Sequence, residues 1–217
     1  MAESALKSGR SPEDIMLLAA TKTVPVPVIN KGIQLGITCI GENKVQELMD
    51  KYDELDLSAC QCQFIGHLQT NKVKYLIGKV NMIQSVDSGK LAMEISRLSL
   101  KHGITTDILI EVNIGREENK SGVFPEALQE LVCQAAELPG IHVRGLMAIP
   151  PVGDIRETMS YFSNMYKDFV DIKGKKIDNV SMDYLSMGMS SDYAEAILCG
   201  ANLVRVGSAL FGARRYL

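Results

Sequence analysis

The amino-acid sequence predicts an α/β protein with the architecture of a (β/α)8 TIM barrel, a parallel eight-stranded sheet closed within a single domain over residues 1–217. Eight short apolar segments alternate with amphipathic helical segments, and 217 residues suffice for eight such units around one core. The strands are expected at residues 15–21, 38–41, 63–66, 82–86, 107–113, 142–149, 184–187 and 203–206. An open doubly wound sheet stays as the alternative, because periodicity alone does not prove closure.

The helices follow from apolar residues spaced three and four apart between these strands. They are expected at residues 26–35, 44–52, 90–102, 125–137, 156–172 and 191–200, with a short helix near 72–77. Ser88 and Ser191 are predicted N-caps, and Gly103 and Gly140 are predicted C-terminal stops. The nearly continuous apolar run at 108–112 is typical of a strand covered on both faces. Because no linker, repeat or low-complexity segment interrupts this pattern, one domain is expected.

Composition and charge exclude several classes of function. The net charge of −3 predicts no binding to nucleic acid or to an anionic membrane. No apolar stretch approaches the roughly 18 residues of a membrane span, and the N-terminus lacks a signal-peptide core, so a cytoplasmic protein is expected. The five cysteines follow no framework spacing and fit reduced thiols. Cys60 and Cys62 have no second Cys/His pair at a zinc spacing, so no metal is predicted.

Lys22 is the most informative side chain. It closes the apolar run of the first strand and directly precedes a proline-bounded loop, and in a barrel the carboxyl ends of all strands face one pocket. Partial burial of a lysine disfavours its charged form, and the neutral amine is a nucleophile that forms Schiff bases with carbonyls. Lys22 is therefore a candidate Schiff-base lysine.

The loops after the seventh and eighth strands have the composition of a phosphate site. The first contains Ser186, Met189 and Ser190, and the second contains Gly207 and Ser208. A glycine–serine helix start is usually only a cap. At these two strands of a barrel, however, backbone N–H groups at helix N-termini commonly bind phosphate without a cationic side chain.

Two further strand-end residues point into the same predicted pocket. Arg205 lies between Val204 and Val206 in the last strand, where a buried charge is costly unless it is paired. A structural salt bridge to a neighbouring strand is one interpretation, and contact with a ring nitrogen or carboxylate of a ligand is the other. Asn43 follows the second strand and can both donate and accept hydrogen bonds.

A Schiff-base lysine, a phosphate site and an arginine in one barrel mouth together suggest pyridoxal 5′-phosphate. The sequence resembles the pyridoxal phosphate homeostasis proteins, single-domain relatives of the alanine racemase N-terminal barrel, known as fold type III. The resemblance rests on residues 19–23, 40–47, 64–72, 112–113, 120–122, 144–150, 185–190 and 204–212. The amino-acid sequence of residues 66–72 is closer to that of the eukaryotic members of the family. The family usually has a longer first helix than residues 2–10 allow here.

The resemblance implies roles for the predicted site residues. Lys22 would hold the cofactor as an internal aldimine, and Asn43 would lie near its ring. Ser190, Gly207 and Ser208 would hold the phosphate, with Ser186 and Met189 completing the cofactor-binding set. Arg205 would face the pyridine nitrogen and, being always protonated, would keep that nitrogen unprotonated. An aspartate there would create a strong electron sink, so carbanion chemistry is expected to be poorly supported.

A carrier of the cofactor is therefore predicted rather than an enzyme. Racemisation needs two positioned acid/base groups, and in the resembled racemases the second is a tyrosine from another domain of the partner subunit. The chain ends at Leu217, directly after the eighth unit, and Tyr184 and Tyr193 are the nearest substitutes. No catalytic residue is assigned. The expected protein buffers or delivers pyridoxal phosphate in vitamin B6 homeostasis, as a monomer or weak dimer in transient contact with apo-enzymes.

Three alternatives stay open at this point. The first is a pyridoxal phosphate-dependent amino-acid racemase, and the second is a cofactor-free Schiff-base aldolase. The third is a phosphate-binding regulatory barrel in which Lys22 only pairs with an anion. A visible absorbance band that disappears in Lys22→Ala distinguishes the predicted cofactor carrier from the aldolase and the regulatory barrel.

Overall fold

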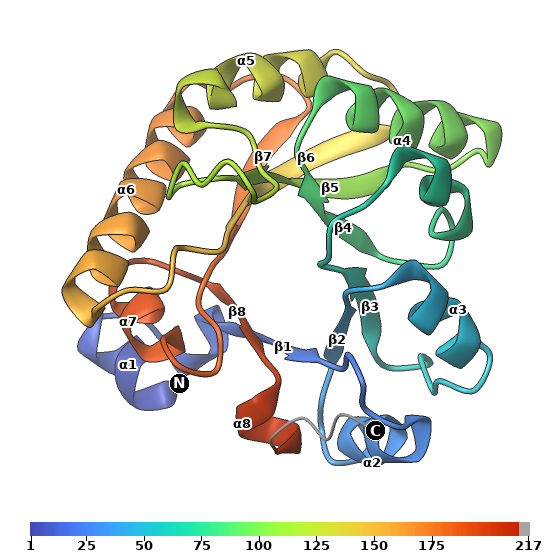
Figure 1. The fold of residues 1–217 in the computed structure, drawn as a ribbon, viewed down its shortest axis with the longest axis horizontal. Helices are drawn as coiled ribbons and strands as arrows, with labels where there is room; N and C mark the ends of the chain where they lie inside the picture. Colours follow the sequence, from blue (N-terminus) through green and yellow to red (C-terminus); the bar gives the residue numbers. More distant parts are fainter. Residues whose placement is uncertain (213–217) are drawn as a thin grey trace.

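The computed structural model describes residues 1–212 as a ring of eight parallel strands surrounded by helices (Figure 1). The strands are β1 Met16–Ala20, β2 Cys39–Glu42, β3 Gln61–Phe64, β4 Met82–Val86, β5 Thr106–Val112, β6 Ile141–Ala148, β7 Val180–Ser186 and β8 Leu203–Val206. They follow one another around the barrel in sequence order. Residues 213–217 of the predicted domain lie outside the described residues.

Pairing of the first and last strands closes the sheet. β1 pairs in parallel with β2 on one side and with β8 on the other, with Ala20 opposite Gly41 and Leu18 opposite Arg205. This closure confirms the predicted barrel and excludes the open doubly wound sheet. It also brings the carboxyl ends of β1, β2 and β8 side by side.

The helices lie outside the barrel and differ in a few places from the sequence prediction. They are α1 Ala2–Lys7, α2 Val26–Gln34, α3 Val45–Tyr52, α4 Gly89–Lys101, α5 Pro125–Ala136, α6 Ile155–Gly174, α7 Tyr193–Leu198 and α8 Ser208–Phe211, with 3-10 turns η1 Pro12–Asp14 and η2 Thr70–Tyr75. The short helix expected near 72–77 is the 3-10 turn η2. β7 begins at Val180, earlier than predicted, because Val180 pairs with Val143 and the exposed Asp183 forms an ion pair with Arg144 of β6.

The main core lies between the barrel and its helices, and the barrel interior is partly polar. The large apolar cluster includes Phe64, Ile83, Ile108 and Phe162, all fully buried. Smaller interior clusters contain Leu18 with Leu203 and Met82 with Leu109. Polar interior side chains include those of Gln63, Gln84, Ser186 and Arg205, which are at most 4% exposed.

Neither a membrane-spanning helix nor a metal site is found among the described residues. Within residues 1–212, no helix combines the length and the apolar character needed to cross a membrane. In the same part of the chain, no three His, Cys, Asp or Glu side chains group closely enough to hold a metal ion. All five cysteines are free thiols.

Candidate functional site

A cavity of about 560 Å³ opens at the carboxyl ends of β1, β2 and β8 and beneath the loop after β7. Seven of the eight predicted site residues line it: Lys22, Asn43, Met189, Ser190, Arg205, Gly207 and Ser208. The rest of the lining is largely apolar and includes Val24, Ile65, Ile149 and Phe211. The fold therefore assembles one pocket from both ends of the chain, since residues as far apart as Ala20 and Gly212 line it.

Two basic side chains are the charged groups of this lining among residues 1–212. Lys22 extends from the end of β1, and Arg205 comes from within β8. An apolar pocket that holds an amine and a guanidinium suits a flat ligand that carries negative charge. The amine adds the capacity for a covalent bond to a carbonyl.

Lys22 lies on a tightly constrained turn. The preceding residue, Thr21, is fully buried, and its N–H donates to the Gly41 carbonyl at 2.9 Å. The following residue, Thr23, has φ of 64°, a left-handed conformation that is rare for a β-branched residue. Such outliers persist where the surrounding structure over-determines them, commonly at functional sites.

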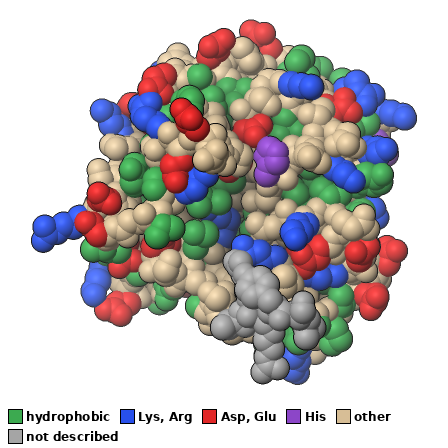
Figure 2. Space-filling view, in the orientation of Figure 1, with side chains coloured by type: hydrophobic (Ala, Val, Ile, Leu, Met, Phe, Trp, Pro, Cys, Tyr) green, Lys and Arg blue, Asp and Glu red, His purple; other side chains and the backbone are tan. Residues whose placement is uncertain are grey.

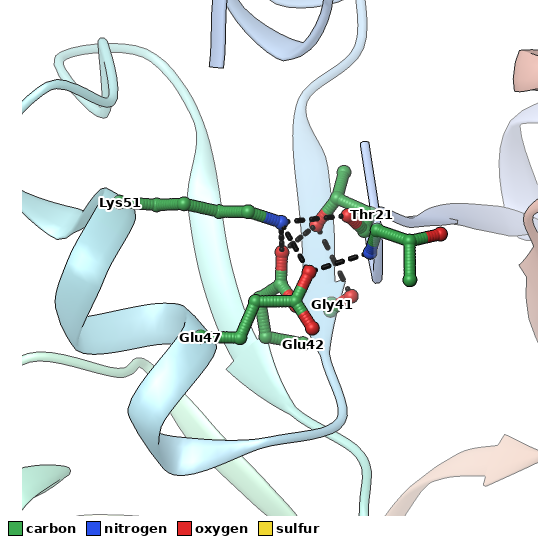
Figure 3. Close-up of polar contacts among 6 residues, drawn as sticks. Thr21, Gly41, Glu42, Glu47 and Lys51 are labelled. Carbon is green, nitrogen blue, oxygen red and sulfur yellow. Dashed lines mark hydrogen bonds and ion pairs between the residues drawn. The ribbon is translucent and has the colours of Figure 1, made fainter. Parts of the chain in front are cut away.

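A group of charged residues and threonines centred on Lys51, here called the Lys51 cluster, supports this turn from β2 and α3 (Figure 3). Its members are Thr21, Thr23, Glu42, Glu47 and Lys51. Lys51 Nζ donates to the Thr21 carbonyl at 3.0 Å and forms ion pairs with Glu42 Oε1 at 3.0 Å and Glu47 Oε1 at 2.6 Å. Thr21 Oγ1 donates to Glu42 Oε1 at 2.7 Å, and the Thr23 N–H donates to Glu47.

The two carboxylates of the Lys51 cluster differ in their surroundings. Burial raises the pKa of Glu42, and the Thr21 hydroxyl and the Lys51 ammonium offset part of that increase. Burial also raises the pKa of Glu47, but hydrogen bonds from Lys51 and from the Thr23 N–H outweigh it and leave that pKa below its usual value. Lys51 was overlooked from the sequence alone, although Glu47 and Lys51 have the four-residue spacing of a helical ion pair.

Arg205 is 4% exposed and has neutral hydrogen-bond partners within the described chain. Its Nη1 donates to Ser186 Oγ at 2.5 Å and its Nη2 to the Ala148 carbonyl at 2.9 Å. Burial lowers the pKa of Arg205 to about 10, and the nearby Glu111 and Asp192 counteract that decrease. The side chain therefore stays protonated at neutral pH.

Ser186, the eighth predicted residue, lies below the cavity rather than in its lining. Its hydroxyl accepts from Arg205 and donates to Gln84 Oε1 at 2.7 Å, and Gln84 Nε2 donates to Gln63 Oε1 at 2.6 Å. A guanidinium can only donate hydrogen bonds, so the Ser186 hydroxyl must accept from Arg205 and donate to Gln84. The Gln84 amide then donates to Gln63, and every bond of the series runs in the same direction. The sequence overlooked Gln63 and Gln84, since a glutamine inside a strand gives no local signal of such a contact.

The loops after β7 and β8 are joined at Ser190. Its Oγ accepts from the N–H of Gly207 at 3.1 Å and from the N–H of Ala209 at 3.3 Å. The two backbone donors thus converge on one oxygen atom at the start of α8. Gly207 keeps this region compact, because a Cβ there would lie 3.2 Å from the Ala20 carbonyl oxygen.

Asn43 brings an unused acceptor to the cavity. Its Oδ1 is buried and has no hydrogen-bond partner among the described residues. Gly66 packs directly on the Asn43 backbone, since a Cβ at Gly66 would lie 2.0 Å from the Asn43 carbonyl oxygen. A buried acceptor without a donor costs free energy, so a ligand that supplies a donor here would bind favourably.

Two tyrosines considered as second bases lie elsewhere. The Tyr184 ring packs under the Arg144 guanidinium at 5.3 Å, inside the barrel, and Tyr193 packs against the main core. Neither lines the cavity. His67, whose Nδ1 lies 3.6 Å from Asp87, is also outside the lining.

The sequence and the fold both match known proteins. Residues 20–215 match the family model described as alanine racemase, N-terminal domain. The pyridoxal phosphate homeostasis protein of Aquifex aeolicus (strain VF5) is 45% identical over 210 residues, which cover 97% of this chain and 92% of that protein.

Two solved structures share the fold at comparable identity. An unknown protein from Bifidobacterium adolescentis has a TM-score of 0.92 and 35% identity, and covers 97% of this chain and 89% of its own. PipY from Synechococcus elongatus PCC7942, solved with pyridoxal phosphate bound, has a TM-score of 0.86 and 32% identity. The match covers 97% of this chain and 99% of PipY. These relatives are bacterial, so the expected closeness to eukaryotic members is not borne out. The chain belongs to the pyridoxal phosphate homeostasis protein family, whose barrel is that of the alanine racemase N-terminal domain.

Proposed function

We propose that this protein binds pyridoxal 5′-phosphate and buffers or delivers it within the cell, as part of vitamin B6 homeostasis. The observation that carries the proposal is the placement of Lys22 and Arg205 in one apolar cavity together with the Ser190–Gly207 contact. Membership of the homeostasis family and the bound cofactor in PipY support it.

The residues of the cavity fit the four polar groups of this cofactor, which are its aldehyde, pyridine nitrogen, phosphate and ring hydroxyl. Lys22 is the nucleophile for the aldehyde, and Arg205 is a permanent donor for the pyridine nitrogen. The N–H groups of Gly207 and Ala209 are donors for the phosphate, with Ser190 and Ser208 beside them. Asn43 Oδ1 is an acceptor for the ring hydroxyl. When bound, the cofactor supplies an electrophilic aldehyde that a lysine can capture.

We further propose that the protein has little or no catalytic turnover. Lys22 and Arg205 are the ionisable side chains of the described cavity lining, and Arg205 stays protonated at neutral pH. This leaves Lys22 as one group able to exchange a proton, whereas racemisation requires two, one on each face of the substrate. An alanine racemase turnover above about 1 s⁻¹, the low end of ordinary enzyme rates, would refute this part of the proposal.

One spectroscopic experiment tests cofactor binding. Incubation with pyridoxal phosphate is expected to produce a visible absorbance band that persists through gel filtration in the wild type and is absent in Lys22→Ala. Lys31→Ala, which alters an exposed lysine of α2, is the matched control and should keep the band. A wild-type protein that stayed colourless would favour the aldolase or the regulatory barrel instead.

We also propose the setting in which the protein acts. It would work in the cytoplasm, where free thiols persist, and burial raises the pKa of one of them, Cys62, to about 12. It would act as a monomer or weak dimer that contacts apo-enzymes transiently. Transfer of the cofactor that stops when a dialysis membrane separates the two proteins would support direct contact.

A further inference from the structure

We propose that Lys51 is a positioning residue for Lys22, which fixes the backbone on both sides of the Schiff-base lysine and thereby sets the rate at which its covalent bond forms. The inference deepens the proposed function and rests on it. Lys51 belongs to α3 and is absent from the cavity lining, so it acts through its neighbours.

The ammonium of Lys51 uses all three of its donors within the Lys51 cluster. Its acceptors are the Thr21 carbonyl, Glu42 Oε1 and Glu47 Oε1, at 3.0, 3.0 and 2.6 Å. The Lys51 side chain is 12% exposed and that of Glu42 is 0% exposed, so water competes little for these bonds. Three acceptors that lie in different directions hold a flexible lysine in one geometry.

The same contacts immobilise the residue before Lys22 and the residue after it. Thr21 is held through its carbonyl by Lys51 and through its hydroxyl by Glu42. Thr23 is held through its N–H by Glu47, which is itself paired with Lys51. In Figure 3 the Lys51 side chain reaches from its helix to the strand end at which these groups meet.

Strain at Thr23 indicates that the cluster imposes the conformation of this turn. A threonine at φ of 64° is held in a left-handed region that is unfavourable for a residue with a branched Cβ. The Thr23 N–H reaches Glu47 from this conformation. The turn therefore depends on an acceptor that Lys51 holds in place.

Stability alone does not account for the Glu42–Lys51 ion pair, in which the Glu42 side chain is fully buried and that of Lys51 is largely buried. Replacing a buried ion pair by apolar side chains of similar volume is often neutral or stabilising, because desolvation offsets the attraction between the charges. Glu42 Oε2 is also buried with no hydrogen-bond partner among the described residues, which adds to the cost. Defined geometry is the benefit that a buried network of this kind supplies.

The step that benefits is the capture of the aldehyde. Lys22 Nζ attacks the aldehyde carbon of pyridoxal phosphate, a carbon–nitrogen double bond forms, and the aldehyde oxygen leaves as water with the two amine protons. Holding the backbone at Thr21 and Thr23 restricts the positions of the amine, and a displacement of about 1 Å can slow such a step by about 100-fold.

The test compares two ligands in Lys51→Met. Pyridoxal phosphate reports on Lys22 through the rate at which the visible band appears at saturating ligand. Pyridoxine phosphate carries the same ring and phosphate but no aldehyde, so its affinity, measured by calorimetry, reports on the rest of the cavity. The variant should slow the appearance of the band about tenfold or more and leave the pyridoxine phosphate affinity unchanged.

A matched control separates this effect from loss of any ion pair. Lys7→Met removes the exposed Glu3–Lys7 pair, which has the same four-residue spacing as Glu47–Lys51, and should change neither measurement. Should Lys51→Met fail to fold, Glu47→Gln replaces it, because the Glu47 side chain is partly exposed and the substitution keeps its shape.

Each outcome decides the question. An unchanged rate in the Lys51 and Glu47 variants overturns the inference, as does an equal loss of rate and of pyridoxine phosphate affinity, which would indicate a merely structural role. Absence of the band in the wild type would instead refute the proposed function itself.

Discussion

Arg205 in β8 donates a 2.5 Å hydrogen bond to Ser186 in β7, so a residue below the cavity orients the guanidinium that lines it. The same hydroxyl donates to Gln84 on the opposite side of the barrel interior. Among residues 1–212 the hydrogen-bond partners of the arginine are therefore neutral groups, the Ser186 hydroxyl and the Ala148 carbonyl. A guanidinium oriented in this way keeps its charge available to a ligand.

The first prediction concerns this hydroxyl. Ser186→Ala removes the acceptor of Arg205 Nη1 and the donor to Gln84 Oε1, and both groups stay buried. Leaving them unsatisfied should lower the free energy of unfolding by about 1–3 kcal/mol and weaken the binding of pyridoxine phosphate. Urea unfolding and calorimetry measure the two effects. Ser163→Ala, at an exposed serine of α6, is the control and should change neither.

The second prediction concerns the contact between the two loops. Ser190→Ala removes the oxygen that accepts from the Gly207 and Ala209 N–H groups. Because Ser190 fixes the position of the loop that is assigned to the phosphate, the variant should bind pyridoxine phosphate more weakly but should react with pyridoxal, which has no phosphate, at the wild-type rate. Competition binding and absorbance kinetics provide these values. A loss for pyridoxal equal to that for pyridoxine phosphate would contradict the assignment.

The third prediction concerns the close approach at Gly66. Gly66→Ala places a Cβ 2.0 Å from the Asn43 carbonyl oxygen, far inside van der Waals contact, so the backbone of Asn43 has to move. The variant should lose stability and also cofactor affinity, because Asn43 lines the cavity. Thermal unfolding and absorbance titration measure the two losses.

Gly174→Ala is the matched glycine control for that variant. Gly174 ends α6, and a Cβ there meets no atom within 4 Å. This substitution should leave binding unchanged and raise the free energy of unfolding by up to about 1 kcal/mol, because alanine favours the helix and restricts the unfolded chain. If both variants behaved alike, the contact between Gly66 and Asn43 would have no role in binding.

The fourth prediction is a pH dependence from Glu111, which is 5% exposed at the end of β5. Burial raises its pKa, Ser121 lowers it by hydrogen bonding, Asp87 raises it, and Arg205 and His67 lower it. Since the net shift is upward, the folded state binds more protons than the unfolded state above the ordinary glutamate pKa. The contribution of Glu111 to stability is therefore present at low pH and is lost as the pH rises through its folded pKa.

Glu111→Gln isolates this contribution. Glutamine keeps an acceptor for Ser121 Oγ but does not ionise, so the decrease in stability above the ordinary glutamate pKa should be smaller in the variant. The variant should consequently be more stable than the wild type at neutral pH. Urea unfolding at several pH values gives the difference, in which the other titrating groups cancel. Parallel stability curves for the two proteins would show that Glu111 does not titrate in this range.

Local patterns in the sequence were enough to predict the barrel and the residues that line its cavity. Alternation of apolar and amphipathic segments predicts the eight units. A helix buried on one face and a strand buried on both faces each show a pattern of apolar residues that is visible within a short stretch of sequence. Lys22 and Arg205 were recognisable for the same reason, since Lys22 directly follows an apolar strand and Arg205 interrupts one. Their roles toward the cofactor stay predictions, although the fold places both in one cavity.

The supports behind these residues depend on tertiary structure. Gln84 reaches Ser186, and Lys51 reaches Thr21, only because the closed barrel brings β4 across to β7 and α3 against the end of β1. No local pattern distinguishes such a glutamine or lysine from a solvated one. The sequence by itself determined the fold class and the residues at the strand ends, because buried strands and buried helix faces repeat apolar residues at a characteristic local spacing. The tertiary structure decided which polar groups hold those residues in place, because hydrogen-bond partners far apart in the chain are chosen only when the sheet closes.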